Sequence, residues 1–146
     1  MPPAPTTEVV RDESTGWVDL RGDGGVLKRV IREGNKDSGL PINGWCAKVN
    51  YDAWIEGGWL NGRKIATSRD RKDEDGDFMF LLGDNHAAVK DGWVIRGLNY
   101  VAETMHRGEM AECIFTPAYA FGAKGSKAFP RVPPNATLRY EVEMLT

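Results

Sequence analysis

The order of apolar and polar residues predicts a protein built mainly from short strands. Residues 45–57 read WCAKVNYDAWIEG, and every second side chain from the first is apolar or aromatic. One face of this strand would carry Trp45, Ala47, Val49, Tyr51, Ala53 and Ile55, and the other Cys46, Lys48, Asn50, Asp52 and Trp54. Residues 137–145, TLRYEVEML, alternate in the same way and predict an inner face of Leu138, Tyr140, Val142 and Met144.

Shorter segments predict strands at residues 16–20, 26–34, 78–83 and 109–117, the last with Ala111, Cys113 and Phe115 on one side. Residues 96–105, RGLNYVAETM, instead predict a helix. Their apolar residues recur at helical spacing and form one stripe of Leu98, Val101, Ala102 and Met105. Five or six strands with one amphipathic helix over an apolar face predict an antiparallel sheet of the α+β class.

One short helix covers only part of such a sheet, so we expect an apolar groove at the uncovered end. Residues 117–125, PAYAFGAKG, place two aromatic side chains among turn-forming residues. Loops ordinarily carry polar residues, so an aromatic loop indicates a pocket wall or a segment folded back onto the core. This loop is the candidate rim of the groove. Residues 57–64, GGWLNGRK, predict only a glycine-rich connection.

Two loops suggest known binding motifs but lack residues that those motifs need. Residues 21–25, RGDGG, suggest a dinucleotide loop, yet Leu27 stands where the third glycine belongs. Residues 68–77, SRDRKDEDGD, suggest a calcium loop, but the EF-hand register would place Arg71 first and Leu82 at the position of the bidentate acid. We therefore predict a turn and an exposed charged loop.

Length and composition fit one domain. The chain has 146 residues, of which 41% are hydrophobic and 27% charged, and its formal net charge is −2. Residues 1–15 contain prolines and few large side chains, which predicts a flexible tail before a single domain at 16–146. Lysines and arginines are scattered among acids, which argues against a nucleic-acid or anionic-membrane surface. No apolar run has transmembrane length and no signal peptide is evident, so we expect a cytoplasmic protein.

The cysteines and histidines predict neither a metal site nor a disulfide. Cys46 and Cys113 lack metal-ligand spacing and fall on strand faces of opposite character. His86 and His106 lie in a predicted loop and at a helix end, without partner ligands. We expect no cofactor.

Several segments together resemble the FKBP family of peptidyl-prolyl cis-trans isomerases. They are GGVLKRVIREG, AKVNY, GRKIATSRDR, FLLG, VIRGL, MHRGE, and TPAYAFGAKG with VPPNATLRYEVEML, in family order over roughly residues 25–145. The resemblance implies an FKBP-like domain, with a five- to six-stranded curved sheet wrapped around one short amphipathic helix. It implies proline-containing protein or peptide clients. The first segment is similar to FK domains of larger co-chaperones with tetratricopeptide repeats, which implies chaperone complexes through domains absent from this chain.

Prolyl isomerisation needs no nucleophile, because no bond is broken. The barrier, roughly 18–20 kcal/mol, is the loss of amide resonance. An apolar pocket lowers it by stripping water from the carbonyl and binding the twisted geometry. By resemblance, the substrate pocket comprises Tyr51, Ile65, Ala66, Phe78, Val94, Ile95, Leu98, Ala120, Phe121, Val132 and Tyr140, with Arg71 and Trp93 in support. The backbone N–H of Ile95 is the expected donor to a ligand carbonyl.

Four of these positions depart from the family pattern. Ile65-Ala66 stands where the family usually has Phe-Asp, so Arg71 has lost its expected acidic partner. Leu98 replaces a tryptophan at the pocket floor, and Phe121 replaces a tyrosine whose hydroxyl donates a hydrogen bond. We therefore expect weak isomerase activity and weak macrolide binding. The alternative is a catalytically inactive FK module that serves as a protein-binding domain of a larger co-chaperone.

Overall fold

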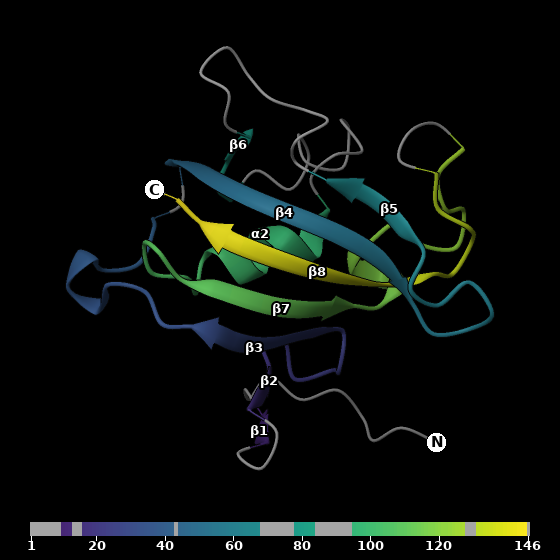
Figure 1. The fold of residues 1–146 in the computed structure, drawn as a ribbon, viewed down its shortest axis with the longest axis horizontal. Helices are drawn as coiled ribbons and strands as arrows, with labels where there is room; N and C mark the ends of the chain where they lie inside the picture. Colours follow the sequence, from purple (N-terminus) through teal and green to yellow (C-terminus); the bar gives the residue numbers. More distant parts are fainter. Residues whose placement is uncertain are drawn as a thin grey trace.

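The computed structural model describes residues 10–12, 16–42, 44–67, 78–83, 95–127 and 131–145. Within these ranges eight strands form one antiparallel sheet in the order β1-β2-β3-β7-β8-β4-β5, and β6 also pairs with β4 (Figure 1). The central strands are β3 (Val26–Arg32), β7 (Met110–Phe115), β8 (Thr137–Met144) and β4 (Cys46–Glu56). The outer strands are β1 (Val10–Asp12), β2 (Trp17–Asp19), β5 (Lys64–Thr67) and β6 (Phe78–Leu81).

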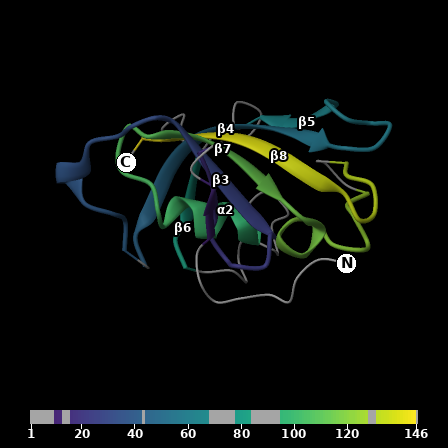
Figure 2. The ribbon, with the colours of Figure 1, turned by 90° about the horizontal axis from the view of Figure 1, so that it is seen from below.

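The sheet curves around one helix, α2 (Arg96–Ala102), the single α-helix of the described residues. Figure 2 shows α2 on the inner side of the sheet, and in Figure 1 it lies behind β8. The α+β class, the antiparallel pairing and the helix inside a curved sheet are thereby confirmed. Two one-turn 3₁₀ helices, η1 (Lys36–Ser38) and η3 (Pro117–Tyr119), lie in the connections.

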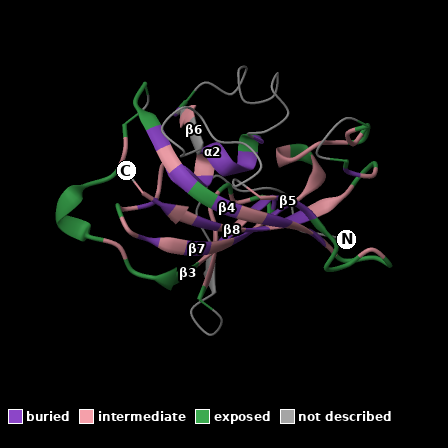
Figure 3. Ribbon diagram, turned by 45° about the horizontal axis from the view of Figure 1, so that its top comes forward, coloured by how far each residue is buried: buried purple, intermediate pink, exposed green. Residues whose placement is uncertain are grey.

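The core lies between the sheet and α2, and burial alternates along β4, β7 and β8 as the sequence predicts (Figure 3). The predicted inner faces of β7 and β8 and the helix stripe are all buried: Ala111, Cys113, Phe115, Leu138, Tyr140, Val142, Met144, Leu98, Val101, Ala102 and Met105. Burying one large apolar side chain contributes about 1.5–3 kcal/mol, so this face supplies the main driving force for folding.

The structure differs from the sequence prediction at several element ends. Trp45 precedes β4 and is 58% exposed, so the prediction that it joins the inner face of β4 was wrong. Helix α2 ends at Ala102, one turn earlier than predicted, because Thr104 and Met105 make tighter turn bonds to Val101 and Ala102. Strand β5, which the sequence analysis does not predict, begins at Lys64, the last residue of the predicted glycine-rich connection, and β1 forms within the predicted tail.

A buried ion pair joins β3 to the chain that follows α2. Lys28 Nζ lies 2.6 Å from Glu109 Oε2, and both side chains are almost fully buried. The same ammonium donates hydrogen bonds to the backbone oxygen and the Oγ1 atom of Thr104. These contacts satisfy a charge that would otherwise be costly to bury, and they fix the segment after the helix against the sheet.

Both cysteines are free, Cys46 exposed and Cys113 buried, as their strand faces predict. Burial raises the pKa of the Cys113 thiol far above its usual value, so this residue behaves as a small apolar core residue. Several predictions concern residues outside the described ranges: the tail before Val10, the charged loop at 68–77, His86, and the loop at 84–92.

Candidate functional site

Two stacked tyrosines form the centre of the candidate site. Tyr51 on β4 and Tyr140 on β8 have ring centroids 5.4 Å apart and an interplanar angle of 21°. In the β4–β8 register Tyr51 faces Val142 and Tyr140 faces Ala53, so the two rings are diagonal neighbours on the inner face. The ring of Phe115 meets Tyr140 edge-on at 5.2 Å. The arrangement is a rigid aromatic floor.

The hydroxyl group of Tyr140 is protonated and uncharged at neutral pH. Burial, and to a lesser extent the neighbouring Tyr51, raises the pKa of Tyr140 well above its usual 10.0. A phenol with such a pKa does not act as a general base. The floor therefore offers apolar surface and ring faces.

The first residues of α2 pack against the core on the helix side of the aromatic floor. Ile95 is the N-cap of α2 and has an extended backbone, and its carbonyl accepts a bond from the Leu98 N–H. Leu98 is fully buried. A Cβ atom at Gly97 would collide with the ring of Phe115, so only glycine lets α2 approach the sheet this closely. Among the described residues, the Ile95 N–H has no backbone hydrogen bond.

A β-bulge places two consecutive residues of β5 in the core. Ala66 pairs with Ala53, but Lys64 pairs with Trp54, so Ile65 is an extra residue in the ladder. Consecutive strand residues normally point to opposite faces, and a bulge relaxes that alternation. Ile65 and Ala66 are accordingly both buried.

The aromatic loop after β7 folds back onto the core. Its backbone is held by bonds from the N–H groups of Ala120 and Gly122 to the carbonyl of Pro117. Gly122 has a φ of +69°, which favours glycine. The Asn135 N–H bonds to Gly122 and ties the loop to the segment before β8. Ala120 and Phe121 are half-buried against the core, as expected of a rim or a folded-back segment.

Tyr119 anchors this loop, a role that the sequence did not single out. Its hydroxyl donates a 2.6 Å hydrogen bond to Asp23 Oδ2, and its ring meets Tyr100 edge-on at 5.9 Å. The guanidinium of Arg96 lies over the same ring at 5.3 Å. A side chain at Gly25 would collide with Tyr119, which explains a glycine there. Tyr119 of the aromatic loop therefore packs against the turn RGDGG and bonds to it.

The remaining candidate residues are only partly described. Val132 is buried, and its backbone makes two hydrogen bonds with Ser126. Phe78 begins β6 opposite Val49. Arg71, Trp93 and Val94 lie outside the described residues. The structure therefore brings together Tyr51, Tyr140 and Leu98 around the inner face, with Ile65 and Ala66 on the adjoining strand.

The side chains at the centre of the candidate site are buried. The side chains of Tyr51, Leu98 and Tyr140 are each at most 2% exposed. Ile95 and Val132 are also buried, whereas Ala120 and Phe121 retain partial exposure. The described residues thus form a buried floor with a half-exposed loop at its edge.

Comparison with known proteins identifies the family. Residues 41–145 match the model of the FKBP-type peptidyl-prolyl cis-trans isomerase domain. The chain belongs to this FKBP family. It is 40% identical over 127 residues to the mouse protein named peptidyl-prolyl cis-trans isomerase FKBP4, covering 87% of this chain and 24% of that relative.

Two further relatives come from an insect and a plant. FK506-binding protein 59 of Drosophila melanogaster is 36% identical over 128 residues, covering 88% of this chain and 25% of the relative. Peptidyl-prolyl cis-trans isomerase FKBP20-1 of Arabidopsis thaliana is 34% identical over 128 residues, covering 88% of this chain and 60% of the relative. The FKBP domain thus spans about a quarter of the mouse and fly relatives. None of its described helices is long and apolar enough to span a membrane.

Proposed function

We propose that this FKBP domain isomerises X–Pro bonds of protein clients, with weak turnover and weak macrolide binding. The observation that carries the proposal is the stacked pair of Tyr51 and Tyr140, buried on the inner face beside Leu98. An aromatic, apolar surface of this kind suits a proline ring. Membership of the family supplies the reaction class.

The proposed mechanism is binding of the twisted amide. Resonance keeps the X–Pro bond planar and is strongest when water hydrogen-bonds to the carbonyl oxygen. An apolar floor removes that water, and a surface that fits the twisted bond better than either planar isomer lowers the barrier. The N–H of Ile95, at the start of α2, is the proposed donor that holds the client backbone.

Three substitutions relative to the family pattern support the expectation of weak activity. Ala66 has no carboxylate, and Phe121 has no hydroxyl to donate. Each missing hydrogen bond costs about 0.5–1.5 kcal/mol of ligand binding. Leu98 offers less stacking area than a tryptophan, a loss of roughly 1–3 kcal/mol. Together these losses weaken macrolide binding by orders of magnitude, while isomerisation, which relies on the apolar floor, is less affected.

Access to the floor is proposed to occur past the aromatic loop. Ala120 and Phe121 are the half-buried residues at its edge, and Val132 is proposed as the opposite rim. The floor side chains are almost fully buried, so a client would contact them at the edge that this loop borders.

The wider role is also a proposal. We propose a cytoplasmic function in protein folding, with proline-containing clients and with chaperone complexes formed through other domains. Support comes from the similarity to FKBP4 and FK506-binding protein 59, of which this chain spans about a quarter. A balanced charge and scattered basic residues support a protein client over nucleic acid.

The proposal is tested by the rate of cis–trans exchange of a short peptide containing Leu-Pro, measured by exchange NMR with and without the protein. We expect an exchange rate above that of buffer alone, and a lower rate for Phe121→Ala. Trp59→Ala is the matched control, because Trp59 is 92% exposed on the β4–β5 hairpin. If the exchange rate with the wild-type protein equals the rate in buffer alone, isomerase activity is excluded and the inactive protein-binding module is favoured.

A further inference from the structure

A hollow lies at the opposite end of β8 from the aromatic loop. Its volume is about 420 Å³, within the usual range of small-molecule pockets. The lining residues come from the β3–β4 connection, the segment after α2 and the end of β8: Ser38, Gly39, Leu40, Pro41, Trp45, Cys46, Met105, Arg107 and Met144. Tyr140 and Met144 are four strand residues apart, which is roughly 13 Å. The hollow is therefore separate from the proposed proline floor.

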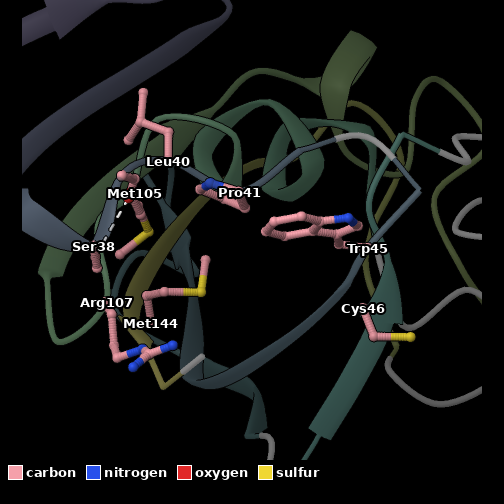
Figure 4. A pocket seen from close by; sticks show the side chains of 9 residues that line it. Ser38, Leu40, Pro41, Trp45, Cys46, Met105, Arg107 and Met144 are labelled. Atoms are coloured by element: carbon pink, nitrogen blue, oxygen red, sulfur yellow. Dashed lines mark hydrogen bonds between the residues drawn. The ribbon is translucent and has the colours of Figure 1, made fainter.

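The floor and walls of this hollow are apolar and polarisable. Met105 and Met144 are buried beneath it, and Figure 4 shows both thioethers facing the space below Pro41. The indole of Trp45 extends over the same space, whereas the Cys46 thiol points away. Methionine sulfur makes favourable contacts with aromatic rings, and flexible thioethers adapt to a flat ligand. An aromatic ring is thus a suitable occupant.

The exposed apolar wall is unusual for a protein surface. Leu40 is 48% exposed, and both Ile42 and Trp45 exceed half exposure within the same short connection. Isolated exposed apolar residues are common, but a group of them beside a hollow indicates a binding site.

A single cation lies at the rim. Arg107 is exposed, and Figure 4 shows its guanidinium beside the Met144 side chain. Among the described residues, none that lines the hollow is acidic and none forms an ion pair with the Arg107 guanidinium. A carboxylate on the ligand would complement this charge, because guanidinium groups pair with carboxylates through two parallel hydrogen bonds.

We infer that this hollow binds a small aromatic carboxylate, with its ring between Trp45 and the two methionines and its carboxylate at Arg107. The site shares no residue with the proposed proline pocket, so the inference stands independently of isomerase activity. The assignment combines an apolar space of suitable size with a charge at its edge that pairs with no described residue.

The test uses the full chain and 2-naphthylacetate as the probe, with the neutral isostere 2-(2-naphthyl)ethanol as the comparison ligand. Titrations follow the tryptophan indole N–H signals and the methionine methyl signals by NMR. We expect saturable shifts at Trp45, Met105 and Met144, and none at the indole of Trp59. Assignment uses Trp45→Phe, since the chain has five tryptophans.

Arg107→Gln tests the charge, and Arg63→Gln on the β4–β5 hairpin is the matched control. We expect Arg107→Gln to weaken naphthylacetate binding about three- to fivefold, as for an exposed ion pair, without changing binding of the alcohol. Arg63→Gln should change neither. Absence of saturable shifts at Trp45 and the methionines would overturn the site, as would shifts at Tyr51 and Tyr140 alone. Equal affinity for acid and alcohol, or an unchanged Arg107→Gln variant, would overturn the carboxylate assignment.

Discussion

Tyr51 and Tyr140 stack at a centroid distance of 5.4 Å across two neighbouring strands that hold them in fixed register. The stacking depends on the long β4–β8 ladder, which sets the two side chains diagonally on one face. Leu98 approaches the same core from α2. The pair therefore links the fold to the proposed function, since sheet and helix together determine the shape of the floor.

Tyr140 should make stability decrease at high pH. Its pKa is raised in the folded state, whereas the unfolded chain titrates near the usual value of 10.0. Above that pH the unfolded state loses the proton first, so the free energy of unfolding falls by about 1.4 kcal/mol per pH unit for this group. Below pH 10 the contribution is fully present. Urea unfolding at several pH values should show that Tyr140→Phe reduces this dependence; an identical slope in both proteins would contradict the assignment.

The buried pair of Lys28 and Glu109 should tolerate joint replacement better than single replacement. Removing one partner leaves an uncompensated buried charge, so Lys28→Met or Glu109→Leu should each lower the free energy of unfolding by about 3–5 kcal/mol. The double variant, Lys28→Met with Glu109→Leu, should lose less than the sum of the single changes. Chemical denaturation measures all three. Strict additivity would show that the two groups are not energetically coupled.

The hydrogen bond from Tyr119 to Asp23 should be visible in the titration of Asp23. This bond is the main cause of a lowered Asp23 pKa, with smaller contributions from nearby backbone N–H groups and Arg21. Tyr119→Phe should therefore raise the Asp23 pKa towards 3.8. Because the pKa of Asp23 is depressed in the folded state, the stabilisation from this bond is present above the unfolded-state pKa of 3.8. It is lost as the pH falls through the lower folded-state pKa. NMR titration of the carboxyl carbon provides the measurement, and an unchanged pKa would show that the loop is not anchored there.

Restoring the family residues should increase macrolide affinity. The combined variant Ala66→Asp, Leu98→Trp and Phe121→Tyr regains two polar groups and stacking area, so we expect a gain of about tenfold or more. The larger side chain at the fully buried Leu98 should cost about 1–3 kcal/mol of stability through overpacking. Ala123→Asp, on the exposed side of the loop, is the control for added charge. A folded combined variant with no gain in affinity would show that the pocket residues are wrongly mapped.

The sequence predicts β4, β7 and β8 well because their burial follows a strict period of two. In β8, every inner residue from Leu138 to Met144 is buried, as the alternation requires. The helix stripe is equally clear, although its last member, Met105, lies in a turn beyond the end of α2. Such patterns identify which face is buried and leave element ends uncertain by about a turn.

Strand β5 and the Tyr119 anchor were missed for physical reasons. The bulge at Ile65 interrupts the alternation that marks a strand, and the glycines before it indicate a connection. Tyr119 and Asp23 are far apart in sequence, so no local pattern reveals their hydrogen bond. The only local sign of this contact is Gly25. A larger residue there would collide with the Tyr119 ring, but this becomes evident only once the ring is placed in the structure.

The most direct test of the proposed floor is an intermolecular NOE experiment with a proline-containing peptide labelled in the proline ring. If the floor binds clients, the proline Hγ and Hδ protons will show NOEs to the ring protons of Tyr51 or Tyr140. The Met144 methyl group, at the far end of β8, will show none. NOEs confined to Met144 or to the exposed Trp59, with none to either tyrosine, would contradict the assignment of the stacked pair as the proline-binding surface.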